Sequence, residues 1–454
     1  MIDWLIAHGI VGRSDLPIPE WLFGWAAALV LLVSFVALAV LWPQPRLEGD
    51  GWRRLFPLPG APVIEAVCGA VGVFLLGVTV WAGLAGEQTS AANWAPTFVY
   101  VIFWLGFAAA SVLLGDVFKV FNPWRALARA VAGAAKLARG GSLPAPLSYP
   151  ERLGRWPAAA GILAFTWMEL AATDGDMPRN VAIAALVYSA LTWIAMALYG
   201  IDRWIERGEA FSVYFNLFSR VSVWERRGRD VGIRRALSGL AALQPLPGTV
   251  PLLAVMIGSV TFDGAAESSP WTDIAPDMSE FFQDLGLSPE TALMVTYTIG
   301  LLVAIGLVYG FYRLGVAGAR TVGGGFSADR LANGFVHSLV PIAFVYAAAH
   351  YMTLLLFQGQ AIWFLASDPL GEGDDFFGTA DRAIDYSVIG ANATWYWQVG
   401  FVVAGHVAAL MLAHDRALAL YREAREAVRS QYWMLGIMVG FTTLALWLLS
   451  QANQ

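Results

Sequence analysis

Residues 21–41 read Trp21-Leu-Phe-Gly-Trp-Ala-Ala-Ala-Leu-Val-Leu-Leu-Val-Ser-Phe-Val-Ala-Leu-Ala-Val-Leu41, a run without any charged side chain. A helix rises ~1.5 Å per residue, so about 20 apolar residues cross the ~30 Å hydrocarbon core of a bilayer. Backbone N–H and C=O groups find no water in that core, and such a run must therefore be helical. The stretch predicts one membrane-spanning helix.

Further apolar runs of similar length follow, and together they predict about ten membrane-spanning helices. The fourth and sixth runs are the shortest. The sequence therefore predicts an all-α polytopic integral membrane protein, with residues 1–454 forming a single transmembrane domain. The predicted spans are residues 20–42, 61–84, 95–115, 157–173, 180–201, 248–265, 290–312, 335–357, 392–413 and 432–450.

The composition points to the same class of protein. Hydrophobic residues make up 58% of the chain and charged residues only 14%, whereas soluble domains average about 25% charged residues. The single cysteine, Cys68, excludes an internal disulfide framework and a cysteine-based metal site. The first run ends at Leu41-Trp42-Pro43 without a small-residue cleavage pattern, so we expect it to be retained as a helix.

Basic residues occupy one set of alternating loops. These loops carry 25 of the 28 Lys and Arg residues, and positive charge stays on the cytoplasmic side of a membrane. The pattern predicts that both termini lie outside the cytoplasm and that the protein is a multi-pass protein of the plasma (bacterial inner) membrane. The basic loops are residues 43–60, 116–156, 202–247, 313–334 and 414–431.

The opposite set of loops is acidic, above all in residues 263–289 and 358–391. Such a face could concentrate cations near the membrane. The alternative interpretation is that the acids only solvate these loops, where basic residues would disturb the topology.

Two segments of the basic loops, residues 124–139 and 209–224, combine apolar and basic side chains. This combination predicts helices that lie along the inner leaflet. Their basic residues would attract anionic lipid, by about 1 kcal/mol per residue near the surface. The expected partners are therefore the bilayer and anionic lipid, and nucleic acid is not expected.

Polar side chains inside the predicted spans are the candidate functional residues, because they are costly in hydrocarbon. Glu169 lies near the outer end of the fourth span, and Asp263 lies at the outer mouth of the sixth. At helical rise, His350 lies ~10 Å and His406 ~21 Å from the outer ends of their spans. These four residues are the candidate catalytic residues.

Three interpretations of these residues remain open. In the first, Glu169, His350 and Asp263 line an outward-opening cavity, with Gln358 and Gln360 at its mouth, that binds a metal or activates water. A carboxylate beside an imidazole would orient the ring for acid–base work or metal binding. This interpretation predicts that Glu169 and His350 lie close together.

In the second interpretation, Glu169, His350, His406 and Asp415 form a ladder that carries protons or a cation across the membrane. In the third, each residue is a structural group bonded to a neighbouring helix, as buried polar groups usually are. A transporter should spread polar groups across the membrane on broken helices, whereas an enzyme should gather them in one closed pocket. The identity of any cofactor or metal is not predicted.

Several stretches resemble a family of bacterial polytopic membrane proteins commonly labelled fenitrothion hydrolase. The similarity runs from the first loop to the last span, and its most characteristic segments are His8–Pro19, Asn122–Leu127, Tyr149–Pro157, His350–Gln360 and Gly405–Arg416. The resemblance implies a membrane-embedded hydrolase of organophosphate-like or other apolar esters, without assigning a catalytic residue. The alternatives are a transporter or channel for a small solute or ion, and a non-catalytic subunit of a membrane complex.

Overall fold

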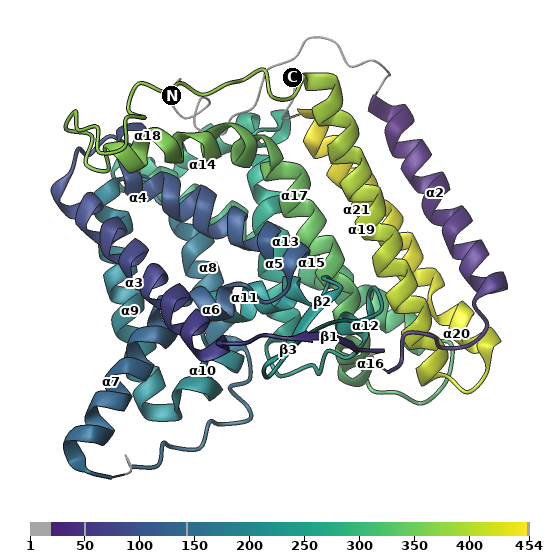
Figure 1. Cartoon of the computed structure of the whole chain (residues 1–454). Coiled ribbons are helices and arrows are strands. Elements are labelled where there is room, and N and C mark those ends of the chain that lie inside the picture. Colours follow the sequence, from purple (N-terminus) through teal and green to yellow (C-terminus); the bar gives the residue numbers. More distant parts are fainter. Residues whose placement is uncertain (1–19, 50, 142–143, 452–454) are drawn as a thin grey trace.

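The computed structural model describes residues 20–49, 51–141 and 144–451, and the segment His8–Pro19 lies outside this part of the chain. The described residues fold into an upright bundle of helices (Figure 1). Nine of the described helices are long and apolar enough to cross a membrane. The predicted class, an all-α polytopic membrane protein, is confirmed.

Each of the ten predicted spans corresponds to helical structure. The third consists of two α-helical pieces flanking the π-helical segment η2. The fourth, α8, has 15 residues, roughly 22 Å at helical rise, and is the one that falls short of a full crossing by length. The helices are α2 (Glu20–Leu41), α3 (Ala61–Ala85), α4 (Trp94–Pro96) with η2 (Thr97–Gly106) and α5 (Phe107–Leu114), α8 (Trp156–Leu170), α9 (Pro178–Tyr199), α13 (Thr249–Ala266), α15 (Pro289–Arg320), α17 (Leu339–Phe357), α19 (Ala391–Leu420) and α21 (Tyr432–Gln451).

The connecting elements divide between the two ends of the bundle. In Figure 1 the elements from the basic loops gather at one end, and α14 (Ser269–Asp284) and α18 (Ile362–Ser367) lie at the other. The assignment of the basic end to the cytoplasm stays a prediction. Its elements include β1 (Arg53–Pro57), α7 (Pro123–Arg139), α10 (Ile201–Arg207), β2 (Trp224–Arg227), β3 (Asp230–Ile233), α12 (Ser238–Ala241), α16 (Ala328–Phe335) and α20 (Ala424–Ser430).

A small antiparallel sheet joins two of the basic loops in the order β1-β3-β2. Ile233 pairs with Arg53 on one side and with Trp224 on the other. Glu65 at the start of α3 anchors the sheet, because one of its oxygens lies 2.7 Å from Nη2 of Arg226 in β2. The sequence did not predict these strands, since their short, basic stretches lack a clear alternation of apolar residues.

The two segments predicted to lie along the inner leaflet differ from each other. Residues 124–139 fall within α7, an amphipathic helix that is mostly exposed. Residues 209–224 instead form α11 (Ala210–Ser219) and lead into β2, and nine of the ten residues of α11 are buried. Its aromatic residues pack among the spanning helices, so α11 lies inside the bundle and not on a lipid surface.

Helix α13 occupies the centre of the bundle. Fifteen of its 18 residues are buried, and it packs against α8, α15 and α17. Gly258 permits the close approach of α15, because a Cβ there would lie 2.6 Å from Cα of Ile305. The helix continues to Ala266, one residue beyond the predicted span 248–265, so Asp263 lies inside it near its C-terminal end.

Candidate functional site

Asp263 is the centre of a buried polar cluster formed by α13 and α17. Its Oδ2 lies 3.0 Å from Nε2 of His350 and accepts a 2.6 Å hydrogen bond from the hydroxyl of Tyr351. The side chains of His350 and Asp263 are only 11% and 5% exposed. Consecutive positions on α17 thus supply both partners of one carboxylate.

The hydrogen bond between His350 and Asp263 can hold a proton on either partner. An imidazole N–H donates to a carboxylate, and a protonated carboxyl donates to an imidazole nitrogen. The tyrosine hydroxyl stabilises the charged carboxylate, since hydrogen bonds to an ionised acceptor are the stronger ones. The pair can therefore accept and release a proton without breaking its contacts.

Glu169 approaches the same cluster from α8. Its Oε2 is buried and accepts no hydrogen bond, and α8 packs directly against α13, the helix that carries Asp263. Tyr351 connects the cluster to the π-helical segment, because its ring lies 5.0 Å from that of Trp104. π-helical turns are rare in proteins, and those that occur are often found at functional sites.

The expected proximity of Glu169 and His350 stays a prediction. His350 pairs with Asp263, and neither Glu169 nor Asp263 lines the small cavity beside His350. A cavity of about 20 Å³ lies beside His350 and is also lined by Tyr346, Thr261 and Val402. A space of this size holds one water molecule and no ester substrate.

His406 lies deeper along the interface between α17 and α19 and is fully buried. Its Nδ1 lies 2.8 Å from the carbonyl oxygen of Val402, which can only accept, so Nδ1 carries the proton in the neutral ring. Its Nε2 has no hydrogen-bond partner and is therefore a buried, unused acceptor. The ring centroids of His406 and Tyr346 are 6.4 Å apart.

Asp415, which the ladder interpretation placed at the inner end, is a structural anchor. Its Oδ1 accepts hydrogen bonds from Nε1 of Trp42 at 3.0 Å and from the backbone N–H of Arg46 at 2.5 Å. The neighbouring His414 lies 3.1 Å from the carbonyl oxygen of Trp42 through its Nε2. These two residues fix the chain that leaves α2 against α19.

Gln360 has a structural role just beyond the C-terminal end of α17. Its side-chain amide bonds the backbone N–H and C=O of Asp385 at 3.0 and 3.1 Å and so holds the long acidic loop. Gln358 begins the same short helical turn, η4 (Gln358–Ala361). Among the residues that the structure describes, no group of three or more His, Cys, Asp or Glu side chains could hold a metal ion.

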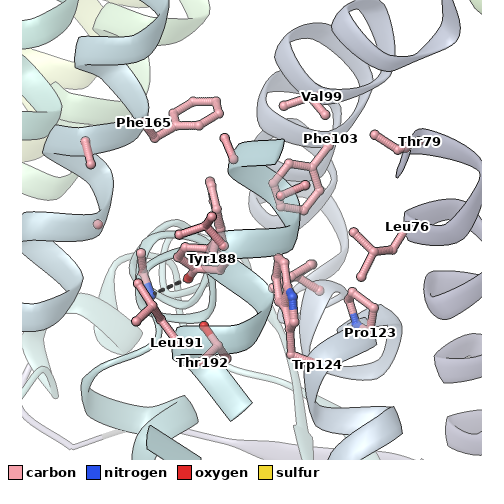
Figure 2. A pocket seen from close by; sticks show the side chains of 18 of the residues that line it. Leu76, Thr79, Val99, Phe103, Pro123, Trp124, Phe165, Tyr188, Leu191 and Thr192 are labelled. Carbon is pink, nitrogen blue, oxygen red and sulfur yellow. Dashed lines mark hydrogen bonds between the residues drawn. The ribbon is translucent and has the colours of Figure 1, made fainter. Parts of the chain in front are cut away.

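A second candidate site is a cavity of about 690 Å³, here called the aromatic cavity. Its lining residues come from α3, η2, α5, α6 (Phe118–Phe121), α7, α8, α9, α10 and α11. Figure 2 shows Phe103, Trp124, Phe165 and Tyr188 around this space. Their rings and that of Phe211 form one continuous wall, with neighbouring centroids 4.8 to 6.5 Å apart. The cavity is separate from the Asp263 cluster, whose side chains do not line it.

The hydroxyl of Tyr188 at this wall donates a short hydrogen bond to the buried carboxyl of Glu209 and accepts one from the backbone N–H of Ala210 (3.1 Å; Figure 2). Glu209 also caps α11 by accepting from the N–H groups of Phe211 and Ser212. Burial raises the pKa of Glu209, and its hydrogen bonds from Ser212 and Tyr188 oppose this rise.

Sequence reasoning missed the aromatic cavity because its walls come from nine separate helical elements. The aromatic residues of η2 count toward a spanning run, and those of α11 toward an interfacial segment. Tyr188 and Glu209 are polar residues next to apolar stretches, but they are 21 positions apart, and this spacing does not predict that they contact each other. No known family model, curated protein or solved structure matches this chain.

Proposed function

We propose that the protein moves protons across its membrane by exchange at Asp263 and His350. The observation that supports this proposal best is the buried Asp263–His350 hydrogen bond at 3.0 Å. Ionisable groups within membrane helices are rare and characteristically belong to proton relays or ion pathways. The proposal follows the second interpretation of the sequence, with Asp263 taking the central position.

The distribution of polar groups favours transport over catalysis. Asp263 and His350 lie toward the outer end of α13 and α17, and His406 lies about two turns deeper on α19. The third span changes to π-helical geometry in η2 beside the cluster and stays one continuous helix from Trp94 to Leu114. Polar groups at several depths of the membrane are what a transporter requires.

A proton would enter from the outer side onto His350 and pass between its Nε2 and Oδ2 of Asp263. The water-sized cavity lined by His350 and Tyr346 would hold one water molecule, and this water would carry the proton in the next step. The unused Nε2 of His406 is then the next acceptor toward the inner side. Each transfer moves one proton and leaves the donor one charge more negative.

The inner half of this route is closed. His406 and His414 are two helical turns apart, ~12 Å at helical rise, and buried apolar residues such as Leu410 and Ala413 lie between them on α19. A proton would reach the inner side after a change in the packing of α17 against α19. Transport would therefore proceed in cycles and not as an open pore.

Proton flux into liposomes tests this proposal. Purified protein is reconstituted with the pH dye pyranine inside, and a potassium diffusion potential set with valinomycin, negative inside, drives protons inward. We expect the wild-type protein to acidify the interior several-fold faster than empty liposomes. The Asp263→Asn variant should abolish the excess, because an amide cannot exchange the proton. Equal rates for wild type and empty liposomes would overturn the proposal.

A second candidate function is hydrolysis of an apolar ester. It is favoured by the sequence resemblance and by the imidazole beside a water-sized cavity, because His350 oriented by Asp263 is arranged as a general base for water. The cavity of about 20 Å³ leaves no room for the ester itself, so this function needs the bundle to open at α13 and α17.

Release of 4-nitrophenolate from a neutral 4-nitrophenyl phosphotriester tests hydrolysis. The protein in liposomes should release the coloured product faster than empty liposomes, and His350→Gln should lose most of this activity. A rate equal to that of empty liposomes excludes this function for the phosphotriester class.

A further inference from the structure

We infer that the aromatic cavity binds a neutral, ring-containing apolar molecule that enters from the hydrocarbon core of the bilayer. This inference does not rest on the proton route, because the aromatic cavity and the small cavity beside His350 have no lining residue in common. The volume of about 690 Å³ lies within the range of small-molecule sites, about 300–1,000 Å³.

The mouth of the cavity opens toward lipid. Val187 and Leu191 of α9 line the cavity and are 54% and 61% exposed. Both belong to a helix long and apolar enough to span the membrane, so their exposed surfaces face hydrocarbon. A molecule that reaches this mouth must first dissolve in the bilayer, which excludes ionic ligands.

The lining gives a charged ligand no partner. Among the described lining residues none is charged. Nε1 of Trp204 is an uncharged donor without a hydrogen-bond partner, and other polar groups of the lining are engaged within the protein. The hydroxyl of Thr79 donates to the carbonyl oxygen of Leu75, and Nε1 of Trp124 donates to the hydroxyl of Ser189. The phenol of Tyr188 is held by Glu209 and Ala210. A neutral ligand therefore fits the site.

The rings of the wall favour an aromatic ligand over an acyl chain. Trp124 and Phe211 are stacked with 14° between their planes, and Phe103 meets Phe211 edge-on at 4.8 Å. The wall thus presents both faces and edges of rings. Aromatic pairs gain about 0.5–1.5 kcal/mol beyond the area that they bury, a gain that a flexible hydrocarbon chain does not share.

Photolabelling with benzophenone, a neutral aromatic probe, tests the inference. The wild-type protein in lipid nanodiscs is illuminated, and the labelled residues are mapped by mass spectrometry. We expect labels concentrated on the cavity-facing residues of α8 and α9, and at least a several-fold reduction by excess naphthalene. A long-chain alkane at equal concentration in the bilayer should not compete.

Two matched variants distinguish labelling inside the cavity from labelling at the lipid-facing surface of the protein. Ala164 of α8 is exposed and lines the cavity, so Ala164→Trp fills it; Ala190 of α9 is exposed but does not line it. Labelling should fall several-fold in Ala164→Trp and stay unchanged in Ala190→Trp, with both variants eluting as the wild type does. Equal labelling of all three proteins, or equal competition by the alkane, would overturn the inference.

Discussion

Nε2 of His350 lies 3.0 Å from Oδ2 of Asp263, although the two residues are 87 positions apart in the sequence. The contact joins α17 to the central helix α13, and both side chains are almost completely buried. A buried carboxylate is costly in hydrocarbon, and the hydrogen bonds from His350 and Tyr351 reduce that cost. One contact therefore combines a structural role with the capacity to exchange a proton.

The first prediction separates these two roles. Asp263→Ala should lower the free energy of unfolding by about 1–3 kcal/mol, because it leaves buried partners unsatisfied. Asp263→Asn keeps an acceptor for the Tyr351 hydroxyl and should cost less. Thermal unfolding in detergent, followed by circular dichroism, measures the difference. No loss of stability in Asp263→Ala would show that the carboxylate contacts do not stabilise the fold.

The second prediction concerns the anchor at Asp415. Its Oδ1 accepts from the backbone N–H groups of Arg46 and Leu47, so Asp415→Ala should release this segment from α19. Hydrogen–deuterium exchange of a peptide covering residues 44–49 should become several-fold faster. Asp415→Asn retains an acceptor and serves as the control. Unchanged exchange in Asp415→Ala would contradict the anchoring role.

The third prediction concerns Glu65, which contacts three arginines near the N-terminal end of α3. Arg226, Arg125 and Arg129 lie 2.7, 3.4 and 3.5 Å from its carboxylate oxygens. Glu65→Gln should destabilise the protein by roughly 1–2 kcal/mol, because charge-assisted hydrogen bonds are lost. Limited proteolysis within residues 225–230 should then be faster. The exposed pair of Arg203 and Glu206 offers a control, since Glu206→Gln should have little effect.

The fourth prediction is topological. The basic loops should face the cytoplasm, so reporter fusions after Gln454 and within residues 225–230 should report opposite sides of the membrane. Five predicted spans lie between the two fusion points, and the result does not depend on the short helix α8, which precedes both. Two reporters on the same side would show that an even number of these five segments crosses the membrane.

The sequence was sufficient to predict the class of fold and most helix positions. Apolar runs have a length that the bilayer dictates, and runs such as 61–84 match α3 (Ala61–Ala85) to within one residue. It also identified Glu169, His350, His406 and Asp263 as the polar groups to examine, since polar residues stand out against apolar runs.

The contacts among these residues could not be predicted, because spacing along separate helices does not determine which faces meet. Asp263 was expected at the mouth of a cavity, and its direct pairing with His350 and Tyr351 could not be predicted from the sequence. The burial of α11 was also missed, because an amphipathic, aromatic segment fits a lipid surface or a protein interior equally well. The aromatic cavity depends on nine helical elements and has no sequence signal of its own.

Infrared difference spectroscopy tests the central claim, proton exchange at Asp263 and His350, most directly. Spectra of the protein in lipid are recorded at steps of external pH, and the carbonyl stretch of protonated carboxyl groups is followed. The account predicts a carboxyl band that changes reversibly with pH, disappears in Asp263→Asn and shifts its midpoint in His350→Gln. A spectrum that is the same in wild type and Asp263→Asn would contradict it.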